Sequence, residues 1–545
     1  MSDIYPSFNP LVNPYPAARS VHYARKGMVT TSQPLAAQAG LRILQQGGNA
    51  IDAAIATAAC LTVVEPTSNG IGGDAFALVW TKRELHGLNA SGLSPKSISI
   101  EKVKALGHSE MPKHGFLPVT VPGIPGAWAE LSKKFGKLSL AECLAPAIEY
   151  AREGYPLSPT LGYYWERGFA AYKRIAQTAD NPEIFKPWFE TFAPADIAPK
   201  IGQIWSSQDH AATLEEIAET NAASFYKGRL AEAIADFCTK NGGFLTAEDL
   251  AEFSPEWVQP ISTDYRGYSI WETPPNGQGL VALIALNILK GYSFTTRDCT
   301  ETYHKQFEAI KLAFACGKEA ITDPAFMRVK TEDLLSEAFA ETLRAKIQAT
   351  AAEPQAFLPP KSGTVYLAAA DSEGNMVSFI QSNYMGFGSG IVIPGTGIAL
   401  QNRGADFSLD PAHANALAGS KRTYHTIIPG FLTKNGVPLG PFGIMGGYMQ
   451  PQAHVQVLMN LIDFGHNPQA ALDAPRWQWT SGKNFEIENH FPRYIAQELT
   501  RKGHAISMAL DSGGFGRGQI ILRDPSTGVL AGGTESRTDG AIAGY

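Results

Sequence analysis

Thr364 is the residue whose position most clearly suggests chemistry, because it follows Gly363 and opens the β-rich run TVYLAAA. In a chain cut before this residue, Thr364 would carry a free α-amine, whose pKa of about 7.7–8.0 suits a base near neutral pH. Such an amine activates the hydroxyl of its own side chain as a nucleophile. The preceding glycine leaves the scissile carbonyl accessible. On spacing alone, a β-favouring Thr that begins a strand is the simpler interpretation.

The pair Gly446-Gly447 precedes a predicted helix at 451–464. Backbone N–H groups at such a place are oriented donors that can hold an oxyanion, although a tight turn would use the same residues. The sequence contains no H-E-x-x-H, no G-x-x-x-x-G-K-[ST] and no G-x-S-x-G. Because its 12 His residues also lack metal-ligand spacing, we expect no catalytic metal and no cofactor.

Hydrophobic periodicity predicts the elements that would position these residues. The segment 50–62 is apolar on all sides and must therefore be a buried helix. The patterns predict helices over 33–46, 50–62, 279–289 and 334–352, a strand over 258–272, and a hairpin of strands 364–370 and 376–381. The Pro-rich segment 351–363 is expected to be exposed, so that a new terminus can form there without breaking a helix.

Composition limits the class of protein. The chain has 545 residues, of which 44% are hydrophobic, enough for a sizeable core. Its 45 Lys+Arg against 51 Asp+Glu argue against a nucleic-acid partner. No secretory signal and no run of about 18 apolar residues is visible, so no membrane partner is expected. The five Cys residues form no C-x-x-C pair, which indicates free thiols in a reducing, cytoplasmic compartment.

Three blocks together resemble the γ-glutamyltranspeptidase family of N-terminal nucleophile hydrolases. They are GGNAIDAAIATAACLTVVEPTSNGIGGDAF from Gly47, TVYLAAADSEGNMVSF from Thr364 with FGSGIVIPGTGIALQNRGADFS from Phe387, and IMGGYMQPQ from Ile444 with the terminal GGTESRTDGAIAGY. They stand in the family's order and cover nearly the whole chain. The resemblance implies an α/β fold, the four-layer αββα sandwich of this superfamily, with strands from both subunits.

The resemblance also implies the chemistry. Members are made as one inactive chain that cuts itself before a Thr, here at Gly363–Thr364. Residues 1–363 would form the large subunit and residues 364–545 the small one, both in one αββα domain. Thr364 would be the nucleophile, and the N–H groups of Gly446 and Gly447 would form the oxyanion hole. Ser382 matches a downstream hydroxyl residue that contacts the nucleophile.

The substrate pocket departs from the family's pattern. Ser91 stands where typical members have an Arg that holds the substrate's α-carboxylate, and Arg403 replaces a Gln. Asp406 matches the acidic residue that holds the α-amino group. His425 and Thr426 replace a pair of serines. The resemblance thus implies a polar pocket with one new cation and one retained anion.

We therefore predict an amidohydrolase that works through an acyl-Thr364 ester, with a γ-glutamyl compound such as glutathione as its small-molecule substrate. One alternative is another carboxylate-bearing amide, such as a glutaryl or cephalosporin side chain or oxamate. A second alternative is an unprocessed, silent homologue with a binding role. No lid loop is identified in the sequence, which favours water over an amino acid as acyl acceptor. The expected partners are the substrate and the two subunits of one precursor, and a homo-oligomer is left open.

Overall fold

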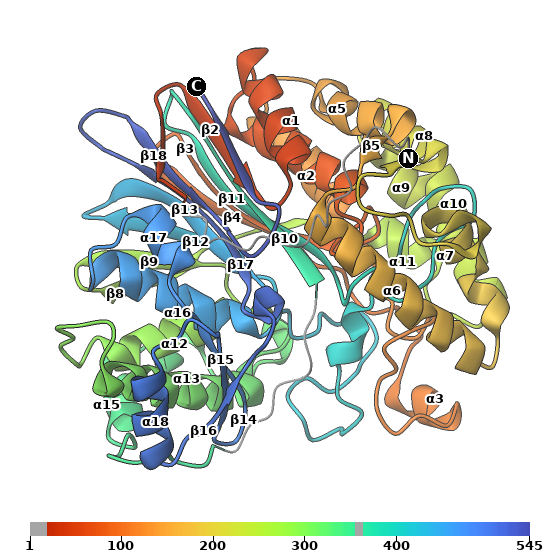
Figure 1. Cartoon of the computed structure of the whole chain (residues 1–545). Coiled ribbons are helices and arrows are strands. Elements are labelled where there is room, and N and C mark those ends of the chain that lie inside the picture. Colours follow the sequence, from red (N-terminus) through yellow and green to blue (C-terminus); the bar gives the residue numbers. More distant parts are fainter. Residues whose placement is uncertain (1–18, 355–362) are drawn as a thin grey trace, which may run out of the picture.

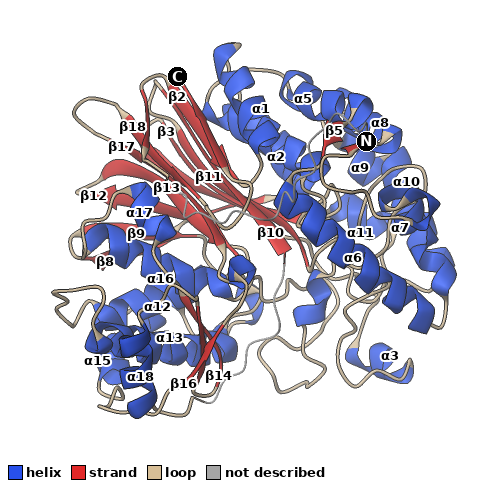
Figure 2. Ribbon diagram, viewed as in Figure 1, coloured by secondary structure: helices blue, strands red, loops and turns tan. Residues whose placement is uncertain are grey.

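The computed structural model describes residues 19–354 and 363–545. Two large sheets lie face to face at the centre of the molecule, and helices cover both outer faces (Figures 1 and 2). Each element buries one face against its neighbour, which produces four layers around continuous cores. The predicted αββα sandwich is confirmed.

The first sheet has seven strands and carries the start of the predicted small subunit. Its order is β19 (Ala541–Gly544), β2 (Gly27–Thr31), β10 (Gly363–Asp371), β11 (Met376–Tyr384), β3 (Asp74–Thr81), β4 (Glu84–Ala90) and β7 (Glu256–Val258). The predicted hairpin is β10–β11, paired antiparallel. Strand β10 lies between β2 and β11, so it is a central strand with neighbours on both sides.

The second sheet also has seven strands. Its order is β1 (His22–Ala24), β18 (Leu530–Thr534), β17 (Arg517–Arg523), β13 (Val437–Met445), β12 (Gly430–Lys434), β9 (Tyr268–Glu272) and β8 (Ile261–Tyr265). Two smaller sheets comprise β14 (Trp477–Ser481), β15 (Asn484–Ile487) and β16 (Ala505–Met508), and β5 (Tyr155–Pro156) with β6 (Ile204–Trp205).

Alternate side chains of β10 serve two different cores. Tyr366, Ala368 and Ala370 face the other sheet, in a cluster with side chains such as Phe431 and Ile521. Val365, Leu367 and Ala369 belong instead to the cluster under the helices. This alternation follows from the two-residue period of a strand and explains why the run is apolar throughout.

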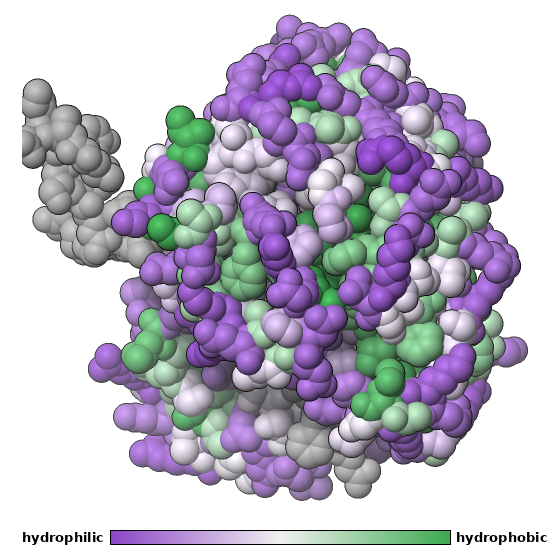
Figure 3. Space-filling model, turned by 90° about the vertical axis from the view of Figure 1, so that its right-hand side faces the viewer, coloured by the Kyte–Doolittle hydropathy of each residue, from purple (hydrophilic) through white to green (hydrophobic). Residues whose placement is uncertain are grey.

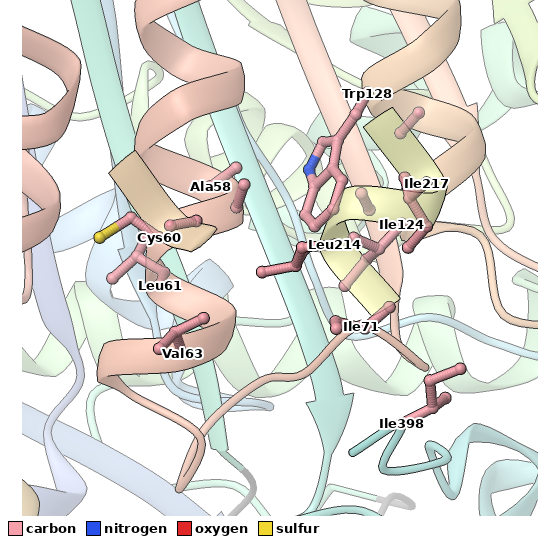
Figure 4. Close-up of a cluster of buried hydrophobic side chains, with 14 of the residues drawn as sticks. Ala58, Cys60, Leu61, Val63, Ile71, Ile124, Trp128, Leu214, Ile217 and Ile398 are labelled. Atoms are coloured by element: carbon pink, nitrogen blue, oxygen red, sulfur yellow. The ribbon is translucent and has the colours of Figure 1, made fainter. Parts of the chain in front are cut away.

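One group of helices lies outside the first sheet, some packed on its strands and the rest on other helices or loops. It contains α1 (Pro34–Gln45), α2 (Ala50–Val64), α3 (Ile100–Ala105), α4 (Ile124–Phe135), α5 (Leu140–Glu153), α6 (Pro159–Thr178), α7 (Lys186–Phe192), α8 (Gln208–Glu219), α9 (Ala223–Lys227), α10 (Arg229–Lys240) and α11 (Ala247–Glu252). Every residue of α2 is buried, as its composition predicted. Figure 4 shows part of the core here, where Trp128 of α4 meets Leu214 and Ile217 of α8. The face turned to the viewer in Figure 3 is mainly hydrophilic, with small scattered apolar groups.

The other helical layer covers the second sheet. It contains α12 (Gly279–Leu289), α13 (Thr300–Ala320), α14 (Thr331–Leu334), α15 (Glu337–Arg344), α16 (Met449–Ile462), α17 (Pro468–Asp473) and α18 (Arg493–Arg501). Helix α12 spans the residues predicted to be helical and is buried along its whole length. Among the described residues, no helix is both long enough and apolar enough to cross a bilayer.

Two sequence predictions need correction. The single strand over 258–272 is three strands, because the turn at Arg266–Gly267 folds β8 back onto β9. The prediction of one helix over 334–352 is also wrong, because Ser336 caps a separate short helix, α15, that ends at Arg344.

After α15 the chain leaves the helix through backbone-bonded turns at 345–347, and contacts from distant residues hold the segment that follows. Lys311 Nζ donates to Ala352 O at 2.6 Å, and Lys502 Nζ donates to Ala349 O at 3.1 Å. Ala351 is buried, so the expectation of exposure fails at this residue. Residues 355–362, which complete the Pro-rich segment, lie outside the described residues.

Candidate active site

Thr364 is the second residue of β10, at a point where the strand's register changes. Gly363 pairs with Tyr384 and Val365 pairs with Gln381, so an irregularity of β-bulge type falls at Thr364. Bulges redirect a side chain out of the regular alternation of a strand. Thr364 is fully buried at this position.

The hydroxyl of Thr364 lies between two oxygens. Its Oγ1 is 2.7 Å from the carbonyl oxygen of Gly363 and 3.1 Å from Oγ of Ser382. Ser382 Oγ also donates to the Gly363 oxygen at 2.7 Å and accepts from the Tyr384 N–H at 2.8 Å. The Gly363 carbonyl is therefore polarised by a serine donor, with a threonine hydroxyl beside it.

The predicted oxyanion glycines follow β13 directly. Gly446 has φ +141° and Gly447 has φ +59°, conformations that side chains disfavour, and the helix α16 begins two residues later at Met449. Gln278 Nε2 donates to Gly447 O at 2.8 Å and to Thr426 O at 2.6 Å, which fixes this turn. The turn thus lies at the N-terminal end of a helix, where backbone dipoles favour negative charge.

A cavity of about 630 Å³ joins the nucleophile region to the glycine turn. Gly363 and Gly446 both line it, so the structure brings the predicted cleavage site and the predicted oxyanion turn to one space. Its walls include apolar side chains, Met385, Phe387 and Met445, and its other lining residues include the cations Arg167, Arg174 and Arg517. These three arginines were not identified from the sequence as site residues.

Three of the predicted substrate-binding residues form one buried group. Arg403 Nη1 donates to Thr426 Oγ1 at 2.8 Å and lies 3.5 Å from Asp406 Oδ2. The Arg403 guanidinium lies over the ring of Tyr384, with its central carbon 4.0 Å from the ring centroid. Arg403 and Asp406 stand in the short helical turn Arg403–Asp406, which places their side chains on one side.

The sequence analysis missed three residues that complete this group. Tyr384 and Tyr448 each donate a hydroxyl hydrogen bond to Asp406 Oδ1, at 2.8 and 2.9 Å. Lys318 of α13 donates to the Tyr448 hydroxyl at 2.5 Å. The sequence held a clue to two of these residues. Tyr384 lies two residues after Ser382 on the same face of β11, and Tyr448 directly follows Gly447. The sequence held no clue to Lys318, because this residue reaches the group around Arg403 from a helix that is distant in the sequence.

Burial sets the protonation of this group. Burial raises the pKa of Tyr384 and Tyr448 well above the usual value, and the charge of Asp406 raises it further. Both hydroxyls therefore keep their protons and act as donors. Burial lowers the pKa of Lys318 to about 8, against the opposing effect of Asp406. The Lys318 amine is thus mostly protonated near pH 7, and its neutral form increases as the pH rises through about 8.

The structure places His425 and Ser91 in a neighbouring network that does not include Asp406. His425 Nε2 is 3.0 Å from Asp74 Oδ2, and both side chains are fully buried. Burial raises the pKa of Asp74 to about 7, partly offset by Arg403 and by a hydrogen bond from Gln401. Ser91 Oγ donates to Asn89 Oδ1 at 2.7 Å. These contacts give both predicted residues a role in holding the walls of the site.

One group of described residues has the composition of a metal site. His304 and Glu308 of α13 and His504 are buried with their ligand atoms within 4.8 Å of one another. Lys311 Nζ, however, lies 2.6 Å from Glu308 Oε1 and supplies a cation there. The two imidazoles are already 2.8 Å apart in a direct hydrogen bond, His304 Nδ1 to His504 Nε2. These contacts pair Glu308 with a cation and the two imidazoles with each other.

A four-layer αββα sandwich with a threonine hydroxyl against the preceding carbonyl, at the head of a central strand, defines an N-terminal nucleophile hydrolase. The gamma-glutamyltranspeptidase family model matches residues 36–545. The chain belongs to this family and is an amidohydrolase.

Relatives within the family carry several names. The chain is 38% identical to the glutathione hydrolase-like YwrD proenzyme of Bacillus subtilis, over 95% of this chain and 98% of the relative. It is 33% identical to the oxamate amidohydrolase proenzyme of Klebsiella pneumoniae, over 96% of this chain and 100% of the relative. The crystal structure of a cephalosporin acylase from Bacillus halodurans is 63% identical, with a TM-score of 0.96 and 99% of both chains covered.

Proposed function

We propose that the chain is a precursor that cuts its own Gly363–Thr364 bond, and that Thr364 then hydrolyses amides whose acyl group carries a carboxylate. The observation that carries this proposal is the position of Thr364 Oγ1, 2.7 Å from the Gly363 oxygen and 3.1 Å from Ser382 Oγ. The proenzyme names of the relatives support the cleavage.

Self-cleavage would begin with attack of Thr364 Oγ1 on the carbonyl carbon of Gly363. Ser382 Oγ, which donates to that carbonyl oxygen at 2.7 Å, stabilises the negative charge as it develops. The intermediate collapses by breaking the C–N bond, which leaves an ester between Gly363 and Oγ1 and frees the α-amine. Water then hydrolyses the ester. The products are residues 1–363, ending in a carboxylate, and residues 364–545, beginning with Thr364.

The mature site would use the new α-amine as its base. In its neutral form this amine takes the proton from Thr364 Oγ1 as the oxygen attacks the substrate amide. The N–H groups of Gly446 and Gly447 hold the oxyanion, and the protonated amine returns its proton to the leaving amine. Water enters the cavity and hydrolyses the acyl-Thr364 ester, releasing the acid.

Two classes of acyl group are candidates for the substrate. Arg403 supports a carboxylate-bearing acyl group, because it is a buried cation beside the nucleophile's strand neighbour Tyr384. The relatives named as oxamate amidohydrolase and cephalosporin acylase agree with this class. The second candidate is a γ-glutamyl amide such as glutathione. The retained Asp406 and the glutathione hydrolase-like relative favour it.

A panel of three p-nitroanilides tests the proposed function. Glutaryl- and γ-L-glutamyl-p-nitroanilide both carry a carboxylate, and valeryl-p-nitroanilide has no charge. We expect the purified protein to release nitroaniline from at least one anionic substrate at least 10-fold faster than from the valeryl compound. Thr364→Ala should release none. A folded parent that hydrolyses none of the three, or an equally active Thr364→Ala variant, would contradict the proposal.

A further inference from the structure

We propose that His454 and Glu272 are positioning residues of the hydrolase, which hold the turn at Gly446-Gly447 so that its N–H groups face the reacting carbonyl. This inference rests on the proposed function, in which that turn is the oxyanion hole. Both side chains are fully buried, and neither lines the cavity of about 630 Å³. Both residues therefore act through the backbone that they hold.

The imidazole of His454 connects the two elements on either side of the glycine turn. His454 lies on α16, which follows the glycines, and its Nε2 accepts a hydrogen bond from the backbone N–H of Ile444 at 3.2 Å. Ile444 lies on β13, two residues before Gly446. Strand β12 pairs with β13 only as far as Phe442, so the imidazole provides an acceptor where the neighbouring strand has ended. One side chain thus ties the strand before the turn to the helix after it.

The contact with Ile444 also fixes the protonation of the imidazole. A backbone N–H can only donate, so Nε2 carries no proton and the proton of the neutral ring is on Nδ1. Nδ1 lies 2.7 Å from Oε1 of Glu272, which is therefore the acceptor. The Phe442 ring packs against the imidazole, with 5.1 Å between the ring centroids. Two hydrogen bonds and one packed face together hold the ring in one orientation.

The segment 272–278 supports the glycine turn from both of its ends. Glu272 is the last residue of β9 and acts on the strand before the glycines through His454. Gln278 is at the other end of the segment, and its Nε2 donates to the carbonyl oxygen of Gly447 at 2.8 Å. The turn is therefore held on its strand side and on its helix side by one short piece of chain.

A carboxyl group buried beside this turn needs a reason, because burial of a polar group is costly unless it is hydrogen-bonded. Oε1 of Glu272 has its partner in His454, and Oε2 finds none among the described residues. Oε2 lies at the start of α12, where an added Cβ on Gly279 would be 3.0 Å away, and the positive end of a helix favours an oxygen there. Burial raises the pKa of Glu272, and His454 opposes this shift. The contact with Nδ1 needs an accepting oxygen, which either protonation state of Glu272 provides.

Self-cleavage and turnover depend differently on the glycine turn. In the proposed function, Ser382 stabilises the oxyanion of self-cleavage, and the glycine N–H groups stabilise the oxyanion of turnover. A displaced turn should therefore lower kcat and leave self-cleavage intact, whereas general damage to the fold would slow both. KM should change little, because the donors act on charge that develops only in the transition state.

His454→Phe removes both hydrogen bonds and keeps an aromatic ring at this position. We expect it to mature at the parent's rate, to lower kcat by about 10- to 100-fold on the better anionic p-nitroanilide, and to change KM less than about threefold. His210→Phe is the matched control, because His210 is a buried histidine of α8 that contacts Ser207, and it should keep the parent's kcat. A mature His454→Phe with normal kcat, or a folded one that does not mature, would overturn the inference.

Two substitutions of Glu272 test the pair from its other end, even if His454→Phe does not fold. Glu272→Gln keeps an oxygen that can accept from Nδ1, whereas Glu272→Met is similar in length and has no oxygen. We expect both to mature, Glu272→Gln to keep kcat within about threefold, and Glu272→Met to lower it about 10-fold or more. A mature Glu272→Met with the parent's kcat, or a loss of about 10-fold in Glu272→Gln, would contradict the role of the pair. A parent that hydrolyses neither anionic substrate would instead contradict the proposed function.

Discussion

The hydroxyl of Tyr384 donates a 2.8 Å hydrogen bond to Oδ1 of Asp406, while the backbone N–H of the same tyrosine donates to Ser382 Oγ at 2.8 Å. One residue at the end of β11 therefore contacts both the group around the nucleophile and the group around Arg403. The distance between the Thr364 hydroxyl and the group around Arg403 is set by a strand, which holds geometry more firmly than a loop does.

Ser382→Ala should slow self-cleavage by about 10- to 100-fold. The substitution removes the donor to the Gly363 oxygen and the acceptor beside Thr364 Oγ1, and the loss of one oxyanion donor typically has at least this effect. The conversion of precursor to fragments, followed on a denaturing gel over time, measures the rate. Ser378→Ala is the matched control, because Ser378 is a buried serine of the same strand that contacts Tyr366. Equal rates for the two variants would refute the role of Ser382.

Arg403→Gln should raise KM for glutaryl-p-nitroanilide by about 10- to 100-fold, since a charge-assisted hydrogen bond contributes about 1.5–3 kcal/mol. The valeryl compound, which has no carboxylate, should be affected far less. Arg422→Gln provides a control, because Arg422 is a buried arginine that pairs with Glu256. A uniform loss for charged and neutral substrates in Arg403→Gln would indicate structural damage and speak against carboxylate binding.

Gly446→Ala should lower kcat by about 100-fold, because alanine keeps the backbone N–H but its side chain would shift the turn and point this donor away from the oxyanion. Its φ of +141° disfavours a side chain, and an added Cβ would lie 3.1 Å from Gly516 Cα. Gly465→Ala separates backbone strain from catalysis, since Gly465 has φ +64° and no atom within 4 Å of an added Cβ. We expect both variants to lose about 1 kcal/mol of stability, but only the first to lose turnover. Normal turnover in self-cleaved Gly446→Ala would remove the oxyanion role.

The stability of the site's supporting loop should depend on pH through Glu535. Burial alone would raise its pKa, but Arg476 and Arg537 outweigh burial and hold it at about 2. Arg476 also donates to the carbonyl oxygen of Gly516, beside Gly446. Because the folded-state pKa is depressed, the stabilisation is fully present above the unfolded value near 4.5 and is lost as pH falls toward 2.

Glu535→Gln tests this relation by chemical denaturation at pH 7, 4.5 and 3. The variant leaves buried Arg476 without its anion, while Arg537 keeps its ion pair with Glu488, so we expect it to be destabilised by about 3–5 kcal/mol at pH 7. The difference from the parent should shrink between pH 4.5 and 3, as the parent's carboxylate becomes protonated in the unfolded state. A difference that is constant with pH would show that the charge of Glu535 does not contribute.

The fold could be predicted from the sequence where the composition of a segment is compatible with only one kind of element and one degree of burial. A helix apolar on every side, such as α2, must be buried, and an apolar run after Gly363 fits a central strand. The prediction failed where tertiary contacts replace helical hydrogen bonds. Residues 345–352 were predicted to be helical, but the helix ends in turns at 345–347. Beyond them, Lys311 donates to the carbonyl oxygen of Ala352 and Lys502 to that of Ala349.

Only those residues of the candidate site that lie in or beside a sequence motif could be predicted from the sequence. Thr364 and the glycine pair stand in contiguous blocks and Ser382 lies just after one of them, so the resemblance predicts these residues. The tyrosines that occupy Asp406 and the lysine behind Tyr448 act through contacts between β11, α13 and the turn before α16. No spacing rule in a single sequence reveals that two tyrosine hydroxyls donate to Oδ1 of Asp406.

The intact mass of the purified protein, measured beside Thr364→Ala and Thr364→Ser, tests the central claim most directly. We predict two fragments in the parent that meet between Gly363 and Thr364, of 363 and 182 residues (545 − 363). Thr364→Ser should give the same two fragments more slowly, and Thr364→Ala should remain a single chain. A folded parent that stays intact, or a Thr364→Ala variant cut at the same bond, would contradict Thr364 as the nucleophile.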